Sequence, residues 1–114
     1  MATFSKQLLS ASTSGKGVKV AATATAGTLI HTADATAKDE VWLYAMNTSS
    51  SAVKLTIEWG EATAPDGNIE VTVLPEAGLL TIVAGLILTG GLTVRAFAAT
   101  TNVIVMHGFV NRIA

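Results

Sequence analysis

Apolar and polar residues alternate with a period of two along several stretches of this chain. The clearest stretch is residues 53–59, where four apolar side chains alternate with three polar ones, and residues 69–73 repeat the pattern. A period of two predicts β-strands with one buried and one solvent-facing side. Between these stretches Pro65, Asp66 and Gly67 favour a turn, because Pro fixes φ and Gly accepts a positive φ. The pattern therefore predicts two strands joined by a loop.

Further apolar stretches predict the remaining strands, and no stretch has a convincing helical period. Residues 40–48 are rich in β-forming residues on both faces, which predicts a central strand. Residues 90–91, both Gly, favour a two-residue hairpin loop that would place Ile87 opposite Val94. We also expect a bulge or bend at Gly108. The other predicted strands cover residues 17–26, 28–33, 79–83, 86–89 and 102–113, with one more beginning at Leu92.

The number and spacing of these stretches predict the architecture. About eight short strands, spaced by about 8 to 12 residues, are typical of a sandwich or barrel, and a jelly roll fits that number best. We therefore expect a single all-β domain, an antiparallel β-sandwich that spans residues 17–114. Residues 1–16 are rich in Ser and carry two Lys. They predict an extended N-terminal arm, within which residues 4–9 could form a short edge strand.

The composition indicates that other chains cover part of this domain. The chain has 114 residues, which suits one domain. Charged residues make up 13% and hydrophobic residues 50%, whereas an ordinary soluble domain carries about 25% charged residues. The mean hydropathy is +0.53. A lone monomer of this composition risks association through apolar patches. The alternative is a Thr- and Ala-rich monomer that its hydroxyl groups keep soluble.

Charge and composition also argue against several classes of protein. The formal net charge of −1 supplies no broad basic field for nucleic acid or for an anionic membrane surface. The chain has no Cys, so disulfides and thiol chemistry are excluded. Residues 77–94 are uncharged over about the length of a bilayer span. Four Gly and three Thr interrupt that stretch, which argues against a membrane helix, and no secretory signal is visible at the start.

The two histidines do not form a recognisable catalytic or metal-binding pattern. His31 and His107 each lie within an apolar strand pattern, and the chain contains no HxH or HExxH motif. We therefore interpret both as core, edge or interface histidines with satisfied hydrogen bonds. A GxSxG motif is also missing from the sequence. The sequence favours a protein that is not an enzyme and has no catalytic residue, metal site or cofactor.

The acidic residues leave two weaker alternatives open. Asp34, Asp39 and Glu40 surround one predicted loop and could hold a cation with oxygen ligands. A solvated acidic loop is the favoured interpretation, because the regular spacing of a calcium loop is missing. Glu58 and Glu70 could also face each other across two strands as an acid and base pair. Charges on the solvent-facing sides of the two strands explain both residues more simply, and this is the favoured interpretation.

The aromatic residues are few, and we expect them to be structural. Trp42, Tyr44 and Trp59 lie beside few cations, which argues against binding of single-stranded nucleic acid. They could form a sugar-binding surface, since aromatic rings have flat apolar faces. Aromatic residues more often fill the core of a sandwich, so the favoured interpretation places Trp42, Tyr44 and Trp59 there.

Two long segments resemble a known family of structural proteins. Residues 40–60, EVWLYAMNTSSSAVKLTIEWG, and residues 85–113, GLILTGGLTVRAFAATTNVIVMHGFVNRI, are similar to head decoration (cement) proteins of tailed bacteriophages. The resemblance covers roughly residues 18–113 and rests on the phrases around Asn47, Trp59 and Asn111. It implies a jelly roll or related sandwich, often trimeric, that sits on the outer surface of the capsid where capsomers meet. A terminal arm would reach onto the shell.

The resemblance therefore implies a structural virion protein, made in the host cytoplasm, whose partners are the major capsid protein and further copies of itself. We expect the N-terminal segment to supply the contact, through Phe4, Lys6, Leu8, Leu9, Lys16 and Lys19. Two rival classes stay open. One is a carbohydrate-binding or host-attachment sandwich, which would expose Trp42 or Trp59. The other is a tail or connector subunit, which would form rings of another symmetry.

Overall fold

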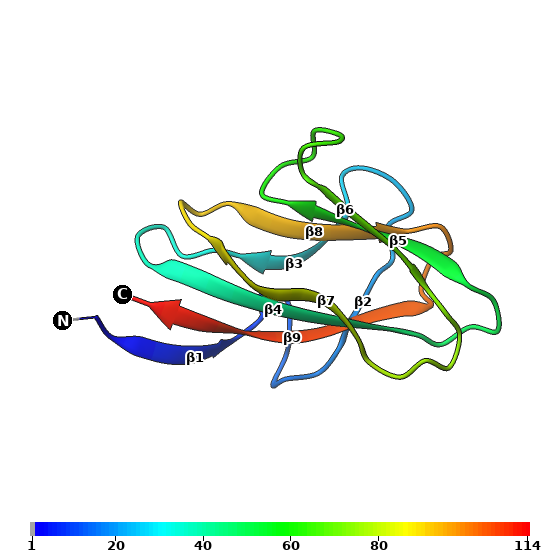
Figure 1. Ribbon diagram of the computed structural model, residues 1–114, viewed down its shortest axis with the longest axis horizontal. Coiled ribbons are helices and arrows are strands. Elements are labelled where there is room, and N and C mark those ends of the chain that lie inside the picture. The colour runs from blue at the N-terminus through cyan, green and yellow to red at the C-terminus, as the bar shows by residue number, and fades with distance from the viewer. Residues whose placement is uncertain (1) are drawn as a thin grey trace.

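The computed structural model describes residues 2–114 as two β-sheets packed face to face (Figure 1). The described part of the chain contains no helix, and therefore no helix that could cross a membrane. The molecule measures 48 × 28 × 20 Å. Its strands are β1 (Phe4–Leu8), β2 (Val18–Lys19), β3 (Thr28–Thr32), β4 (Lys38–Asn47), β5 (Val53–Trp59), β6 (Asn68–Val73), β7 (Leu80–Leu88), β8 (Thr93–Ala98) and β9 (Ile104–Ile113).

The strands form a five-stranded sheet and a four-stranded sheet, here called sheet A and sheet B. Sheet A has the order β1-β9-β4-β7, and β2 pairs with β9 further along the same edge as β1. Sheet B has the order β3-β8-β5-β6. All pairs are antiparallel, and β5 and β6 are the only consecutive strands of residues 2–114 that pair with each other. The predicted all-β antiparallel sandwich is confirmed.

The core between the sheets is aliphatic. From Asp39 onward, side chains on β4 alternate strictly between buried and half-buried positions, as the period-two pattern requires. Val41, Leu43 and Ala45 of β4 are fully buried and meet Leu55 and Ile57 of β5 in the same apolar cluster. No aromatic side chain of residues 2–114 is fully buried. The aromatic residues must therefore lie on the outside or at the ends of the sandwich.

The N-terminal segment lies against the sandwich. β1 pairs with β9 from Phe4 opposite Ile113 to Leu8 opposite Phe109, and it forms one edge of sheet A (Figure 1). Leu9 follows directly and is only 2% exposed, as part of the hydrophobic core. The edge strand expected at residues 4–9 is therefore present as β1. Because Leu9 is in the core, this segment is part of the folded domain.

Two local predictions are wrong. The turn at residues 90–91 exists, with the Leu92 N–H donating to the Thr89 carbonyl at 3.4 Å, but it connects β7 of sheet A to β8 of sheet B. Ile87 consequently does not face Val94, because a turn signal does not determine which sheet the next strand joins. The bulge expected at Gly108 is also missing, since β9 pairs with β4 in one unbroken register.

The strand predicted over residues 17–26 is much shorter in the structure. Only β2 is extended there, and Thr25 and Gly27 of the loop that follows pack over Glu58 on the outer side of sheet B. Glu58 was expected to face solvent but is 2% exposed, because the backbone N–H of Gly27 and the hydroxyl of Thr25 donate to its carboxylate at 2.6 and 2.9 Å. Glu70 forms its own ion pair with Lys54 at 3.0 Å. Each carboxylate of the alternative acid and base pair thus has a separate structural partner.

Candidate functional site

The outer face of sheet A carries an unusual concentration of large apolar side chains. Residues paired across antiparallel strands point to the same side, so the register of β1, β9 and β4 defines this face in rows. One row holds Lys6, Asn111 and Glu40, and the next holds Leu8, Phe109 and Trp42. The apolar and aromatic members of the face are Phe4, Leu8, Trp42, Tyr44, Met46, Val105, Phe109 and Ile113.

The most exposed of these residues lie on the edge strand β1. Phe4 is 71% exposed and Leu8 is 51% exposed, whereas Trp42 and Phe109 are half-buried. The outer side of sheet B is different in character, because its strands present mainly polar and charged side chains. The polar side chains that reach the surface there are Lys54, Glu70, Thr72 and Arg95, whereas Thr56 and Glu58 are buried and Phe97 is half-buried. An exposed apolar patch with polar surroundings is typical of a contact surface, so sheet A is the better candidate for a partner.

An aromatic pair forms the centre of this face. The rings of Trp42 and Phe109 stack with centroids 6.0 Å apart and planes 7° from parallel. Lys6 places its ammonium 4.9 Å from the centroid of Phe109, in cation–π geometry. Gly85 of β7 lies beside the indole with φ +80, and a Cβ at this position would stand 3.0 Å from Cζ2 of Trp42. The missing side chain of Gly85 therefore leaves room for the indole.

Glu40 is held in a fixed orientation next to the aromatic pair. Its Oε1 accepts hydrogen bonds from Nε1 of Trp42 at 2.7 Å and from Nδ2 of Asn111 at 3.0 Å. The hydrogen bond from Asn111, followed by that from Trp42, lowers the pKa of Glu40 below its ordinary value. A shallow cavity of about 350 Å³ lies alongside, and its lining residues are Phe4, Ser5, Lys6, Glu40, Asn111 and Ile113.

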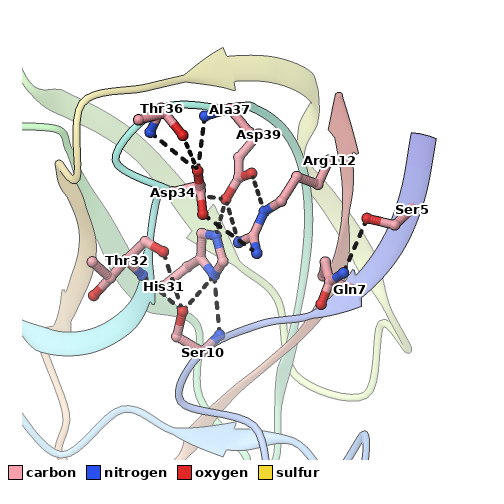
Figure 2. Close-up of polar contacts among 10 residues, drawn as sticks. All are labelled: Ser5, Gln7, Ser10, His31, Thr32, Asp34, Thr36, Ala37, Asp39 and Arg112. Atoms are coloured by element: carbon pink, nitrogen blue, oxygen red, sulfur yellow. Dashed lines mark hydrogen bonds and ion pairs between the residues drawn. The ribbon is translucent and has the colours of Figure 1, made fainter. Parts of the chain in front are cut away.

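A buried polar cluster lies inside the sandwich near the end of β1 (Figure 2). His31 donates from Nε2 to Oδ2 of Asp39 at 2.8 Å, and Arg112 donates from Nε to Oδ1 of Asp39 at 2.8 Å. Nδ1 of His31 accepts from the backbone N–H of Ser10 at 3.0 Å, which assigns the ring proton to Nε2. Burial by itself would raise the pKa of Asp39, but the hydrogen bonds from Arg112, His31 and the backbone of Asp34 outweigh it and hold the pKa at about 2.

Ser10, His31 and Asp39 are linked by hydrogen bonds in the same order as the residues of a Ser-His-Asp catalytic triad, with Ser10 Oγ 2.9 Å from His31 Nδ1. The other contacts of these residues favour a structural role. The backbone N–H of Ser10 already occupies Nδ1, and the Ser10 hydroxyl accepts from the Thr32 N–H at 3.0 Å. Asp39 is shared with Arg112. The cluster thereby ties the segment after β1 to β3, β4 and β9.

The three acidic residues considered for a cation site do not converge on one point. Asp34 accepts hydrogen bonds from the N–H groups of Ala37 and Thr36 at 2.8 and 3.1 Å, and these bonds lower its pKa. Asp34 and Asp39 both face Arg112, at 3.7 and 2.8 Å, whereas Glu40 lies on the outer face of sheet A. Within residues 2–114 no group of three or more His, Asp or Glu side chains could hold a metal ion.

The structure brings most of the predicted contact residues onto one face. Phe4, Lys6 and Leu8 share the outer face of sheet A, and Lys19 joins them by pairing with Val105. Lys16 is exposed in the loop between β1 and β2. Leu9 belongs to the core and is not available to a partner in this conformation, which corrects its assignment as a contact residue.

Sequence reasoning missed the residues at the centre of this face. The expectation that Trp42 and Tyr44 lie in the core is wrong, because both are half-buried on the outside, whereas Trp59 is half-buried and packs against the core. The sequence also did not indicate that Phe109, Asn111 and Glu40 lie on this face. Period-two alternation was available as a signal in β4 and β9, but both alternating sets there contain apolar residues. The sequence alone therefore did not reveal which set faces inward.

No family model matches the chain, and neither a curated protein nor a solved structure shows significant similarity to it.

Proposed function

We propose that this chain is a structural virion protein that decorates the outer surface of a phage capsid, where it binds the major capsid protein at junctions between capsomers. The observation that carries the proposal is the apolar and aromatic outer face of sheet A, with Phe4 and Leu8 exposed on its edge strand. Burying such a face against another protein gains free energy in proportion to the apolar area removed from water. The resemblance of residues 40–60 and 85–113 to decoration proteins supplies the identity of the partner.

The proposal includes a trimer and a jelly-roll order of strands. We interpret the orders β1-β9-β4-β7 and β3-β8-β5-β6 as the two sheets of a jelly roll. Leu86, Ile87 and Leu92 are 47%, 49% and 48% exposed at or beside the opposite edge strand, β7. No charge lies between residues 77 and 94, so copies of the chain could meet at this edge without electrostatic repulsion. A closed ring of three would then bind the shell at several points, which multiplies weak contacts.

Co-sedimentation with capsid shells assembled from the major capsid protein alone tests the proposal. Replacing Phe4 and Leu8 together by Ser should weaken binding at least tenfold, because both apolar contacts are lost while the core is untouched. The matched control replaces Leu74 by Ser, since this residue is 59% exposed and directly follows β6 of sheet B. The proposal fails if the wild-type protein does not sediment with shells, or if both variants bind equally well.

The mass of the protein in solution tests the trimer separately. Analytical ultracentrifugation should give three times the mass of 11.7 kDa, and Ile87→Ser should reduce it. A strictly monomeric wild-type protein would contradict this part of the proposal. A larger ring would favour a tail or connector subunit.

A carbohydrate-binding function is the second candidate, because the stacked rings of Trp42 and Phe109 lie on the outside of the sandwich. Aromatic faces of this kind can pack against a sugar ring. A glycan panel measured with the wild-type protein and with Trp42→Ala decides between the candidates. Binding that depends on Trp42 would favour a host-attachment module over shell decoration.

A further inference from the structure

Glu40 is an oriented carboxylate that has no cationic partner within the chain. Its Oε1 takes both hydrogen bonds, from Trp42 and Asn111, and Oε2 takes none from the described residues. Within residues 2–114 no Lys, Arg or His nitrogen lies within 4.0 Å of this carboxylate. One oxygen of a fixed, ionised group is thus left free beside the cavity.

Two lysines lie near Glu40 on this face, Lys38 two residues earlier on β4 and Lys6 in the same row, and neither forms an ion pair with it. Lys6 is two strands away, with Asn111 of β9 between them, which separates their backbones by about 10 Å at the usual strand spacing. Its ammonium sits over the ring of Phe109 instead. The cavity therefore has a negative group at one side and a positive group at the other, with apolar walls from Phe4 and Ile113.

We propose that this cavity binds the guanidinium group of an arginine side chain from another protein chain, with the free oxygen of Glu40 as the acceptor. A guanidinium is planar, stacks on aromatic faces and forms strong hydrogen bonds to carboxylates. Phe4 lines the cavity and is 71% exposed, so its ring offers such a face, and Ile113 can pack against the methylene groups of the arginine. Lys6 would receive an acidic side chain of the same segment.

The arginine comes from a different protein because both arginines of this chain are engaged elsewhere. Arg112 is bound to Asp39 inside the cluster, and Arg95 donates to the Gly27 carbonyl at 3.1 Å on the outer side of sheet B. On the proposed function, on which this part of the inference rests, the donor is the major capsid protein. The site itself can be tested without any capsid.

The indole N–H of Trp42 reports directly on Glu40, because it is hydrogen-bonded to that carboxylate. The chain has two Trp, so ¹⁵N-labelled protein gives two indole signals, and Trp59 serves as an internal reference. Titration with N-acetylarginine amide should shift the Trp42 signal at millimolar concentrations, and N-acetyllysine amide should act several-fold more weakly. Glu40→Gln, which keeps the acceptor oxygen but removes the charge, should reduce the affinity about tenfold, as expected for a charge-assisted bond. The matched control Glu70→Gln should bind as the wild type does.

An unchanged Trp42 signal, or an equal response in Glu40→Gln, would overturn the inference. Co-sedimentation with shells then distinguishes a failure of this inference from a failure of the proposed function. If wild-type protein and Glu40→Gln sediment equally with shells, the arginine contact is wrong and decoration stands. If the probe shifts Trp42 but no shell binding occurs, the arginine site stands and decoration is wrong. A loss of oligomeric mass in Glu40→Gln would instead identify a second copy of the chain as the occupant, which would also contradict the inference.

Discussion

The buried cluster around Asp39 should make the stability of this protein depend on pH in the acid range. Asp39 is fully buried, bound by Arg112 and His31, and has a pKa of about 2 instead of its ordinary 3.8. The folded state therefore holds this carboxylate ionised at pH values at which the unfolded chain protonates it. The resulting stabilisation is present above about pH 4 and is lost as the pH falls through about 2.

The size of the effect follows from the shift. Each pKa unit corresponds to about 1.4 kcal/mol, so a change from 3.8 to about 2 contributes on the order of 2 kcal/mol to the free energy of unfolding. A domain of this size has about 5–15 kcal/mol in total, so the loss is readily measurable. Asp34 and Glu40 also have lowered pKa values and add a smaller loss in the same direction.

Urea denaturation at a series of pH values from 7 to 2 measures this contribution. Asp39→Asn removes the titrating group and leaves Arg112 and His31 without their anion, so it should lower the free energy of unfolding at pH 7 by about 2–4 kcal/mol. The difference between wild type and Asp39→Asn should then shrink by about 2 kcal/mol on going to pH 2. Asp66→Asn, at an exposed position in the loop between β5 and β6, is the matched control and should keep a constant small difference. A gap between wild type and Asp39→Asn that is the same at pH 7 and pH 2 would refute the reasoning.

Two further substitutions test the packing that positions the outer face of sheet A. Leu9→Ala should destabilise the protein by about 2–5 kcal/mol in thermal unfolding, because Leu9 is a core residue; a change below about 1 kcal/mol would mean that the N-terminal segment is a loose arm. Gly85→Ala should cost about 1–2 kcal/mol and red-shift the fluorescence of Trp42 in a Trp59→Phe background, because the new Cβ meets the indole at 3.0 Å on a backbone with φ +80. An unshifted emission spectrum would show that Gly85 does not position Trp42.

The sequence predicted the fold where the local pattern was unambiguous. β5 was predicted with its observed bounds, since apolar and polar residues alternate strictly there and turn residues follow. Connections were predicted less well, because turn chemistry at residues 90–91 fixes a chain reversal but not the sheet that receives the next strand. The short β2 shows the same limit, since a Val-, Ala- and Thr-rich segment can form a loop when it packs over a buried group such as Glu58.

The candidate site could be predicted only in part, for a physical reason. Phe4, Lys6 and Leu8 alternate in a strand with few other apolar residues, so their common face was accessible from sequence. β4 and β9 have apolar side chains on both faces, and the inward set is decided by the other sheet. Trp42 lies outside because the core positions on either side of it in the chain, Val41 and Leu43, fill the space between the sheets.

Charged and apolar side chains are distributed unevenly over the outer sides of the two sheets. The polar outer side of sheet B carries the Lys54–Glu70 ion pair, whereas the face that includes Trp42 and Phe109 is mainly apolar. Single exposed apolar side chains occur on all protein surfaces and need no explanation. A difference between the two outer faces is a separate observation, because randomly scattered apolar residues would not favour one sheet. Because the apolar residues of this face belong to one sheet, a single flat partner surface could cover them at once. The asymmetry therefore argues for one extended docking face, and the unpaired charges of Lys6 and Glu40 would set the orientation in which that partner binds.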